Sequence, residues 1–296
     1  MSSLRCQLAL PAGFRAEDIL RFHRRDAHSF AERVEAQCLQ KGMLWQGLPA
    51  CLRVEFSAGS VIAELVVDGG AVAAEPLERL LRHILGLNQP VADFEKAHAA
   101  HPQLGPVLAR QIGLRVPQTA TPFEALTWAI TGQQISVGAA VALRRKLIAA
   151  AGAVHSGGLA CYPDADRLAR LDLDTLRAAG FSQSKAQTLL AVSRSVLAGE
   201  LPLDDWLADP PAELMRERLL TMRGIGPWTV NYTLLRGFGW LDGSLHGDAA
   251  VRRGIQQLPG APDAVGDACA RDWLESFKPW RALAAAHLWQ AFASGE

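Results

Sequence analysis

The chain has 296 residues, of which 49% are hydrophobic and 20% are charged, so it can bury a substantial core and is not disordered. Lysine plus arginine number 30, as do aspartate plus glutamate, which gives a formal net charge of zero. This balance excludes a protein that coats nucleic acid through overall basicity, although a local basic face remains open. Five scattered cysteines without CxxC spacing argue against a disulfide framework, a zinc site or an iron–sulfur cluster.

The N-terminus shows no signal peptide, and no run of about 18 uninterrupted apolar residues occurs. Together with the dispersed cysteines, this predicts a cytoplasmic protein without a membrane partner.

The first ninety residues predict a mixed α/β region. Residues 5–10 are a strand candidate, and residues 51–57 and 61–68 alternate as strands joined by a turn. Residues 76–85 then show helical spacing of their leucines and isoleucine.

From about residue 91 the pattern becomes helical and stays so. A helix start with a capping box is predicted by Thr121, Pro122 and Glu124. We expect this helix to run to about residue 130 and to be followed by an interruption at 132–136. We expect further helices at 141–148, 164–170, 173–179, 183–197, 213–221, 227–236, 248–257, 265–275 and 280–292.

A Gly-Ile-Gly turn, Gly224 to Gly226, separates two of these helices. Ile225 would point into the core, and Pro227 suits the first position of the next helix. The N–H groups after the turn would then be free to bind a phosphate oxygen, which requires no particular base sequence. An ordinary turn between packed helices is the alternative interpretation.

Asp248 follows Gly226 by 22 residues and stands just before another helix. It could simply cap that helix. Alternatively, it could face a DNA sugar from which a base departs, stabilising positive charge there or deprotonating a water. Between residues 216 and 253 six arginines stand against three acids, which favours a DNA footprint on one face.

These features resemble the helix-hairpin-helix DNA glycosylase superfamily and, within it, the 3-methyladenine DNA glycosylase II family. The resemblance covers nearly the whole chain. It rests on five motifs: ITGQQIS (130–136), GFSQSKAQTL (180–189), GIGPWTVNY (224–232), GDAAVRR (247–253) and KPWRALAAAHLW (278–289).

The resemblance implies an α+β fold. Residues 1–90 would form an α/β domain with an antiparallel sheet, similar to the TATA-binding fold. An all-α region of two subdomains would follow: 122–240 carrying the hairpin, and 91–121 plus 241–296 carrying the catalytic aspartate.

The resemblance also implies roles for individual residues. Asp248 would be the catalytic acid, and Gln134 the wedge that fills the gap left by a flipped base, although many relatives have a bulky apolar residue there. The remaining positions form three sets: a base pocket of Trp228, Tyr232 and Trp289; DNA-contacting amides of Gly224, Gly226 and Thr229; and main-chain carbonyls of Leu220, Met222 and Ile225 for a structural Na⁺ or K⁺.

The implied activity is base excision. Bifunctional members of the superfamily have a lysine where this chain has Trp228, so we expect a monofunctional enzyme that leaves an abasic site. It would act as a monomer on double-stranded DNA that contains damaged bases, excising alkylated purines without a required cofactor and, in a bacterium, near the nucleoid. A glycosylase for deaminated or oxidised bases and a non-catalytic binder of distorted DNA are the alternatives. The aromatics could also be plain core residues, and Gln134 a polar loop residue.

Overall fold

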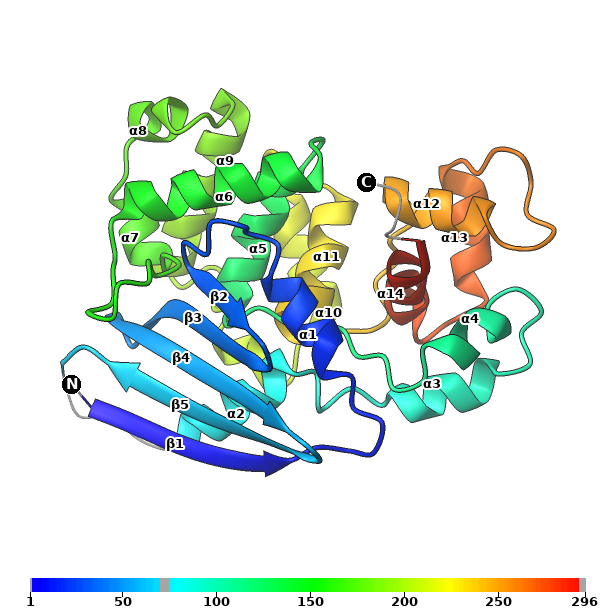
Figure 1. Ribbon diagram of the computed structural model, residues 1–296. Helices are drawn as coiled ribbons and strands as arrows, with labels where there is room; N and C mark the ends of the chain where they lie inside the picture. Colours follow the sequence, from blue (N-terminus) through cyan, green and yellow to red (C-terminus); the bar gives the residue numbers. More distant parts are fainter. Residues whose placement is uncertain (1, 70–74, 293–296) are drawn as a thin grey trace.

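The computed structural model describes residues 2–69 and 75–292 (Figure 1). An N-terminal sheet is followed by a helical region that extends to the end of the described chain. The strands are β1 (Ser2–Ala9), β2 (Glu32–Glu35), β3 (Cys38–Trp45), β4 (Leu48–Ser57) and β5 (Ser60–Val67). The helices of the first part are α1 (Ala16–His23) and α2 (Glu75–Ile84). Those of the second are α3 (Val91–His98), α4 (Gly105–Arg110), α5 (Pro122–Gly132), α6 (Val137–Ala151), α7 (Ala165–Ala169), α8 (Leu173–Ala178), α9 (Gln183–Leu197), α10 (Ala212–Leu220), α11 (Pro227–Phe238), α12 (Ala249–Gln256), α13 (Asp267–Glu275) and α14 (Arg281–Phe292), with a 3₁₀ turn at Asp205–Leu207.

The sheet has the order β1-β5-β4-β3-β2, and all of its pairings are antiparallel. β4 alternates buried Leu52 and Val54 with exposed Arg53 and Glu55, and Leu52 pairs with Leu65 of β5. α1 and α2 contribute to the core on the buried face. The expected antiparallel sheet and the strands at 51–57 and 61–68 are thus confirmed, whereas α1, β2 and β3 were not predicted.

The helical region has two hydrophobic cores. One joins residues from α5 to α11, and the other joins residues from α3, α4 and α12 to α14. In Figure 1 the second group forms a lobe on the right, apart from the sheet. α5 and α11 pack against each other and contribute to both cores, so this helix pair lies at the seam between them.

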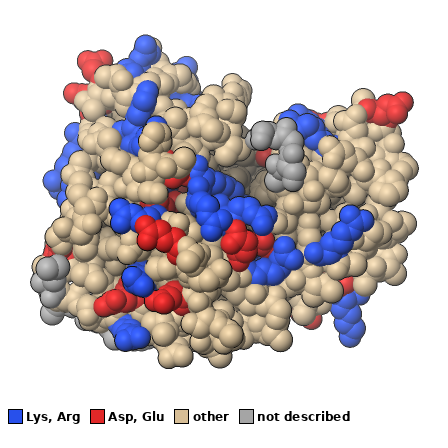
Figure 2. Space-filling model, in the orientation of Figure 1, with Lys and Arg blue, Asp and Glu red and all other residues tan. Residues whose placement is uncertain are grey.

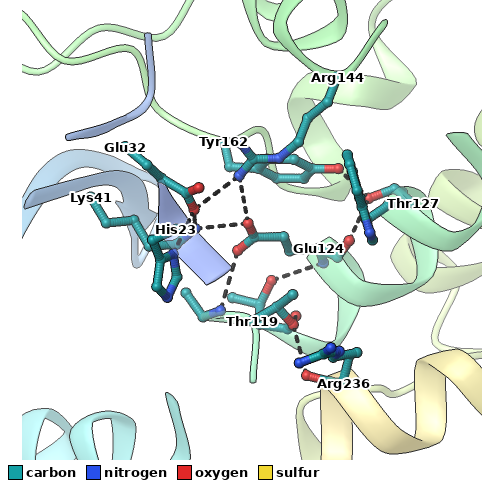
Figure 3. A network of polar contacts seen from close by, with 12 residues as sticks. His23, Glu32, Lys41, Thr119, Glu124, Thr127, Arg144, Tyr162 and Arg236 are labelled. Atoms are coloured by element: carbon teal, nitrogen blue, oxygen red, sulfur yellow. Dashed lines mark hydrogen bonds and ion pairs between the residues drawn. The ribbon is translucent and has the colours of Figure 1, made fainter. Parts of the chain in front are cut away.

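A buried ion cluster of Glu32, Lys41, Glu124 and Arg144 connects the sheet to the helical region (Figure 3). Lys41 Nζ lies 2.7 Å from Glu124 Oε1, and Arg144 Nη2 lies 2.9 Å from Glu124 and 3.1 Å from Glu32. Lys41 also pairs with Glu32. Two acids and two bases therefore neutralise one another at the junction of β2 and β3 with α5 and α6.

The pKa values of the two acids reflect this pairing. Burial alone would raise the pKa of Glu32, but the charges of Arg144, Lys41 and His23 hold it well below its usual value. Burial likewise opposes ionisation of Glu124, and Lys41 and Arg144 outweigh it, so its pKa is also lowered.

The start of α5 differs in one detail from the expected capping box. Thr121 Oγ1 accepts a hydrogen bond from the Glu124 N–H, as predicted. The Glu124 carboxylate, however, accepts from the N–H of Ala120 rather than that of Thr121, because its other oxygen is held by the buried ion cluster.

No helix within the described ranges combines the length and the apolar character needed to cross a membrane. Figure 2 shows basic and acidic side chains interspersed over one face of the molecule. The same face is hollowed between the part built on the sheet and the lobe on the right.

Candidate active site and DNA-binding hairpin

The hairpin between α10 and α11 is built as its sequence predicts. Gly224 has φ +89°, and a Cβ there would lie 2.2 Å from Thr188 Oγ1, so a side chain is excluded on both grounds. Ile225 is buried in the core of the α5–α11 region, and Pro227 begins α11. Gly226 has an extended backbone that other residues also adopt.

The start of α11 offers open hydrogen-bond donors. No side chain caps it, and within the described chain no backbone acceptor is found for the N–H groups of Gly224 and Gly226. Thr229, in the first turn of α11, is buried. Unpaired N–H groups at a helix start are suited to bind an anion.

A second loop, residues 133–136 between α5 and α6, is joined to this hairpin. Gln133 Nε2 donates to the Gly224 carbonyl (2.9 Å) and to Thr229 Oγ1 (2.8 Å). Gln134 next to it is exposed and has φ +57°, so it lies at the tip of the loop. Sequence reasoning missed Gln133, because nothing in its local pattern shows a contact with residues more than 90 positions away.

Asp248 caps the start of α12, so the interpretation of this residue as a helix cap is confirmed. Capping is not its only interaction. Its Oδ1 accepts from the N–H groups of Ala250 (2.9 Å) and Val251 (3.0 Å). Two indoles also donate to the carboxylate: Trp289 Nε1 to Oδ1 at 3.2 Å, and Trp228 Nε1 to Oδ2 at 2.8 Å. A capping aspartate with two tryptophan donors is held more firmly than helix capping alone requires.

The three predicted aromatic residues lie together beside this carboxylate. The ring centroids of Trp228 and Tyr232 are 5.1 Å apart, and those of Tyr232 and Trp289 are 6.2 Å apart. A fourth aromatic, Trp128 of α5, donates from Nε1 to the Tyr232 hydroxyl at 2.8 Å. We call Trp128, Trp228, Tyr232 and Trp289 the aromatic cluster.

The carbonyls predicted to hold a monovalent cation lie at the end of α10 and in the turn. Leu220 ends α10, so its carbonyl is among those without a helical partner, and the Met222 carbonyl accepts from the Ile225 N–H. In the described part of the chain no group of three or more His, Cys, Asp or Glu side chains could hold a metal ion.

An open-amide hairpin, a cluster of tilted aromatic rings in contact and a firmly held carboxylate define the class of DNA glycosylases, which bind the DNA backbone and accept an extruded base. Comparison with known proteins agrees. Residues 127–278 match the family model described as "HhH-GPD superfamily base excision DNA repair protein".

Two curated relatives are similar along most of their length. DNA-3-methyladenine glycosylase 2 of Escherichia coli is 33% identical over 262 residues, which cover 80% of this chain and 87% of that protein. DNA-3-methyladenine glycosylase of Bacillus subtilis is 26% identical, and the match covers 78% of each chain. The solved structure of the 3-methyladenine DNA glycosylase from Archaeoglobus fulgidus superposes with a TM-score of 0.79 at 22% identity, covering 98% of this chain and 99% of that one. The chain belongs to the HhH-GPD superfamily of base excision DNA repair proteins, as its motifs indicated.

Proposed function

We propose that this protein is a monofunctional DNA glycosylase that flips out and excises alkylated purines of the 3-methyladenine and 7-methylguanine type, leaving an abasic site. The observation that carries the proposal is the position of Asp248, fixed by two indole and two backbone donors beside the aromatic cluster. The names of the relatives from E. coli and B. subtilis support the same class of substrate.

The two carboxylate oxygens of Asp248 differ in their hydrogen-bond partners, so we assign them different roles. Oδ1 accepts from Ala250, Val251 and Trp289, so its capacity is used. Oδ2 accepts only from Trp228 among the described residues and retains room for another partner. We assign Oδ2 to the sugar: it stabilises positive charge on C1′ as the bond to the base breaks, and it accepts a proton from the attacking water.

The aromatic cluster suits a damaged purine. Alkylation at N3 or N7 makes the base cationic, and stacking with cation–π attraction is worth roughly 0.5–2 kcal/mol per favourable contact. Trp228 cannot form a Schiff base, and its N–H is already directed at Asp248. Water is therefore the nucleophile, and the DNA strand is left uncut.

DNA would be held around this centre by the hairpin and the loop beside it. The amides of Gly224, Gly226 and Thr229 would bind the phosphates, and Gln134 at its loop tip would enter the gap left by the base. A monovalent cation bound by the carbonyls of Leu220, Met222 and Ile225 would stiffen the turn, and the enzyme would work as a monomer. These roles accord with the open donors of the hairpin and with the exposure of Gln134.

The deciding experiment measures bases released from methylated DNA by wild type and by Asp248→Asn. We expect the variant to be slower by about 10²–10⁴-fold, because Oδ2 acts in the transition state, while duplex binding persists. Asp172→Asn is the matched control, since Asp172 caps α8 through a 2.7 Å bond to the Thr175 N–H and lies outside the site. Base release by Asp248→Asn at the wild-type rate would refute the proposal. Release of only deaminated or oxidised bases by the wild type would reassign the substrate.

A further inference from the structure

Arg236 is a buried arginine that forms no ion pair with an acidic side chain of the described residues. Its side chain is 7% exposed, and Nη1 donates to the Pro117 carbonyl at 2.8 Å. Its Cζ lies 4.6 Å from the centroid of the Phe22 ring and 5.5 Å from that of Trp289. No carboxylate of the described residues lies within ion-pair distance of it, whereas the buried Arg144 pairs with two.

The charge of Arg236 nevertheless persists at neutral pH. Burial lowers its pKa to about 10, and interaction with the Tyr232 hydroxyl partly offsets that effect. Its Nε is buried without a hydrogen-bond partner in the described structure. A buried, uncompensated charge is costly for folding, so it calls for a functional explanation.

The position of Arg236 along α11 relates it to Asp248. Trp228, Tyr232 and Arg236 are spaced by four residues, so they share one face of the helix. Eight residues of helix span about 12 Å. Trp228 at the near end donates to Asp248, and Arg236 packs at the far end against Trp289 and Tyr232. A negative and a positive charge thus flank the aromatic cluster.

We propose that Arg236 supplies a fixed positive charge on the base side of the site and promotes departure of the base, an inference that rests on the function proposed above. When the C1′–N bond breaks, its electron pair goes to the base nitrogen and the sugar becomes an oxocarbenium ion. Water then adds to C1′ and loses a proton to Asp248 or solvent. An alkylated purine passes from charge +1 to 0, and a neutral purine from 0 to −1 before it takes a proton from water.

In both cases the base becomes more negative by one charge and the sugar more positive by one. Arg236 stabilises the first change and Asp248 the second. One unit of positive charge leaves the base and appears on the sugar. With the base roughly 8–10 Å from Arg236, the sugar about 4 Å farther away and an effective dielectric constant of about 20, Arg236 raises the rate by roughly two- to threefold. The same arginine repels a cationic base before the bond breaks, so it weakens binding of that base while it speeds its release.

The test separates binding from rate. Single-turnover rate constants and half-saturating enzyme concentrations are measured on duplexes that carry one 7-methylguanine or one hypoxanthine. With Arg236→Met we expect the rate to fall roughly two- to threefold on each base that the wild type releases. The half-saturating concentration should fall for 7-methylguanine and stay constant for hypoxanthine. A merely structural role would raise this concentration or leave it unchanged.

A second pair of variants leaves the arginine in place. Phe22 is half-buried on α1 and lies against Arg236, so Phe22→Glu sets a carboxylate beside the guanidinium and cancels its field. Phe22→Gln has nearly the same shape without the charge and is the matched comparison. Phe22→Glu should reproduce the effects of Arg236→Met, and Phe22→Gln should not. If Arg236→Met does not fold, the comparison of Phe22→Glu with Phe22→Gln tests the inference by itself.

Both Phe22 variants are made in an Arg25→Met background, because Arg25 packs on Phe22 with its Cζ 4.4 Å from the ring centroid and would otherwise compete with Arg236 for the new carboxylate. Their rates and binding are compared with those of Arg25→Met alone, because the charge of Arg25 also acts on Arg236. Equal rates for Phe22→Glu and Phe22→Gln, or a rate loss in Arg236→Met without tighter binding of 7-methylguanine, would overturn the inference. Absence of base release by the wild type would instead reject the proposed function.

Discussion

Replacement of Lys41 by methionine tests whether the buried ion cluster holds the sheet to the helical region. Lys41 is 1% exposed and pairs with both Glu32 and Glu124. Without it, Arg144 is the one Lys or Arg among the described residues within ion-pair distance of the two buried carboxylates, with His23 Nδ1 3.2 Å from Glu32 Oε1 as the other neighbour. The pairing that offsets the burial of the two carboxylates is therefore weakened. Breaking a buried pair in this way costs about 3–5 kcal/mol, a large part of the 5–15 kcal/mol that stabilises a typical protein.

The measurement is the free energy of unfolding, obtained by denaturant titration or thermal melting. Lys41→Met should unfold markedly earlier than wild type, and the double variant Lys41→Met/Glu32→Gln should recover much of the loss because it restores neutrality. Arg53→Met is the control, since the exposed Arg53–Glu55 pair on β4 contributes at most about 1 kcal/mol. The reasoning is refuted if Lys41→Met unfolds at the same temperature as the wild type. It is also refuted if the loss of stability in the double variant equals the sum of the losses in the two single variants.

Two further predictions concern acid and the loop beside the hairpin. Because the pKa values of Glu32 and Glu124 are lowered in the folded protein, their stabilisation is fully present above about pH 4.5 and is lost as the pH falls through those lowered values. Unfolding followed between pH 6 and 2 should show the loss, and a smaller acid dependence in Lys41→Met/Glu32→Gln; an identical dependence would contradict the assignment. Gln133→Ala removes two hydrogen bonds of roughly 1 kcal/mol each that fix the loop to Gly224 and Thr229. We expect excision from a paired duplex to fall roughly tenfold, with little effect when the damaged base is already unpaired; equal losses on both substrates would show that Gln133 does not position the wedge.

The helical region followed from its sequence more closely than the sheet did. α9 begins and ends where its apolar spacing predicts, and the other predicted helices differ from the observed ones by a few residues. β3 was missed because Lys41 and Gly42 stand at its centre, and both are poor predictors of a buried strand. The structure explains both residues. Lys41 pairs with Glu32 on the neighbouring strand and with Glu124 of α5, and a Cβ at Gly42 would lie 2.1 Å from the Ala160 carbonyl oxygen.

The candidate site was predictable where its residues lie on one stretch of chain. Trp228 and Tyr232 share a helix face, and Asp248 stands at a helix start, so their motifs locate them. Trp128 and Arg236 were not predicted, because a tryptophan and an arginine within apolar helices give no sign of what they contact. Their roles depend on the packing of α5, α11 and α14, which one sequence does not specify.

The carboxylate that caps α12 is also the group proposed to face the sugar. The activity should therefore depend on temperature through the stability of this helix end. Helix ends open locally at a far lower free energy than the whole fold, and α12 has only eight residues. When its first turn frays, Asp248 loses the two amides that orient it, although the cores remain packed. The indoles of Trp228 and Trp289 then hold the carboxylate alone, so we expect base excision to weaken on warming before the protein as a whole melts.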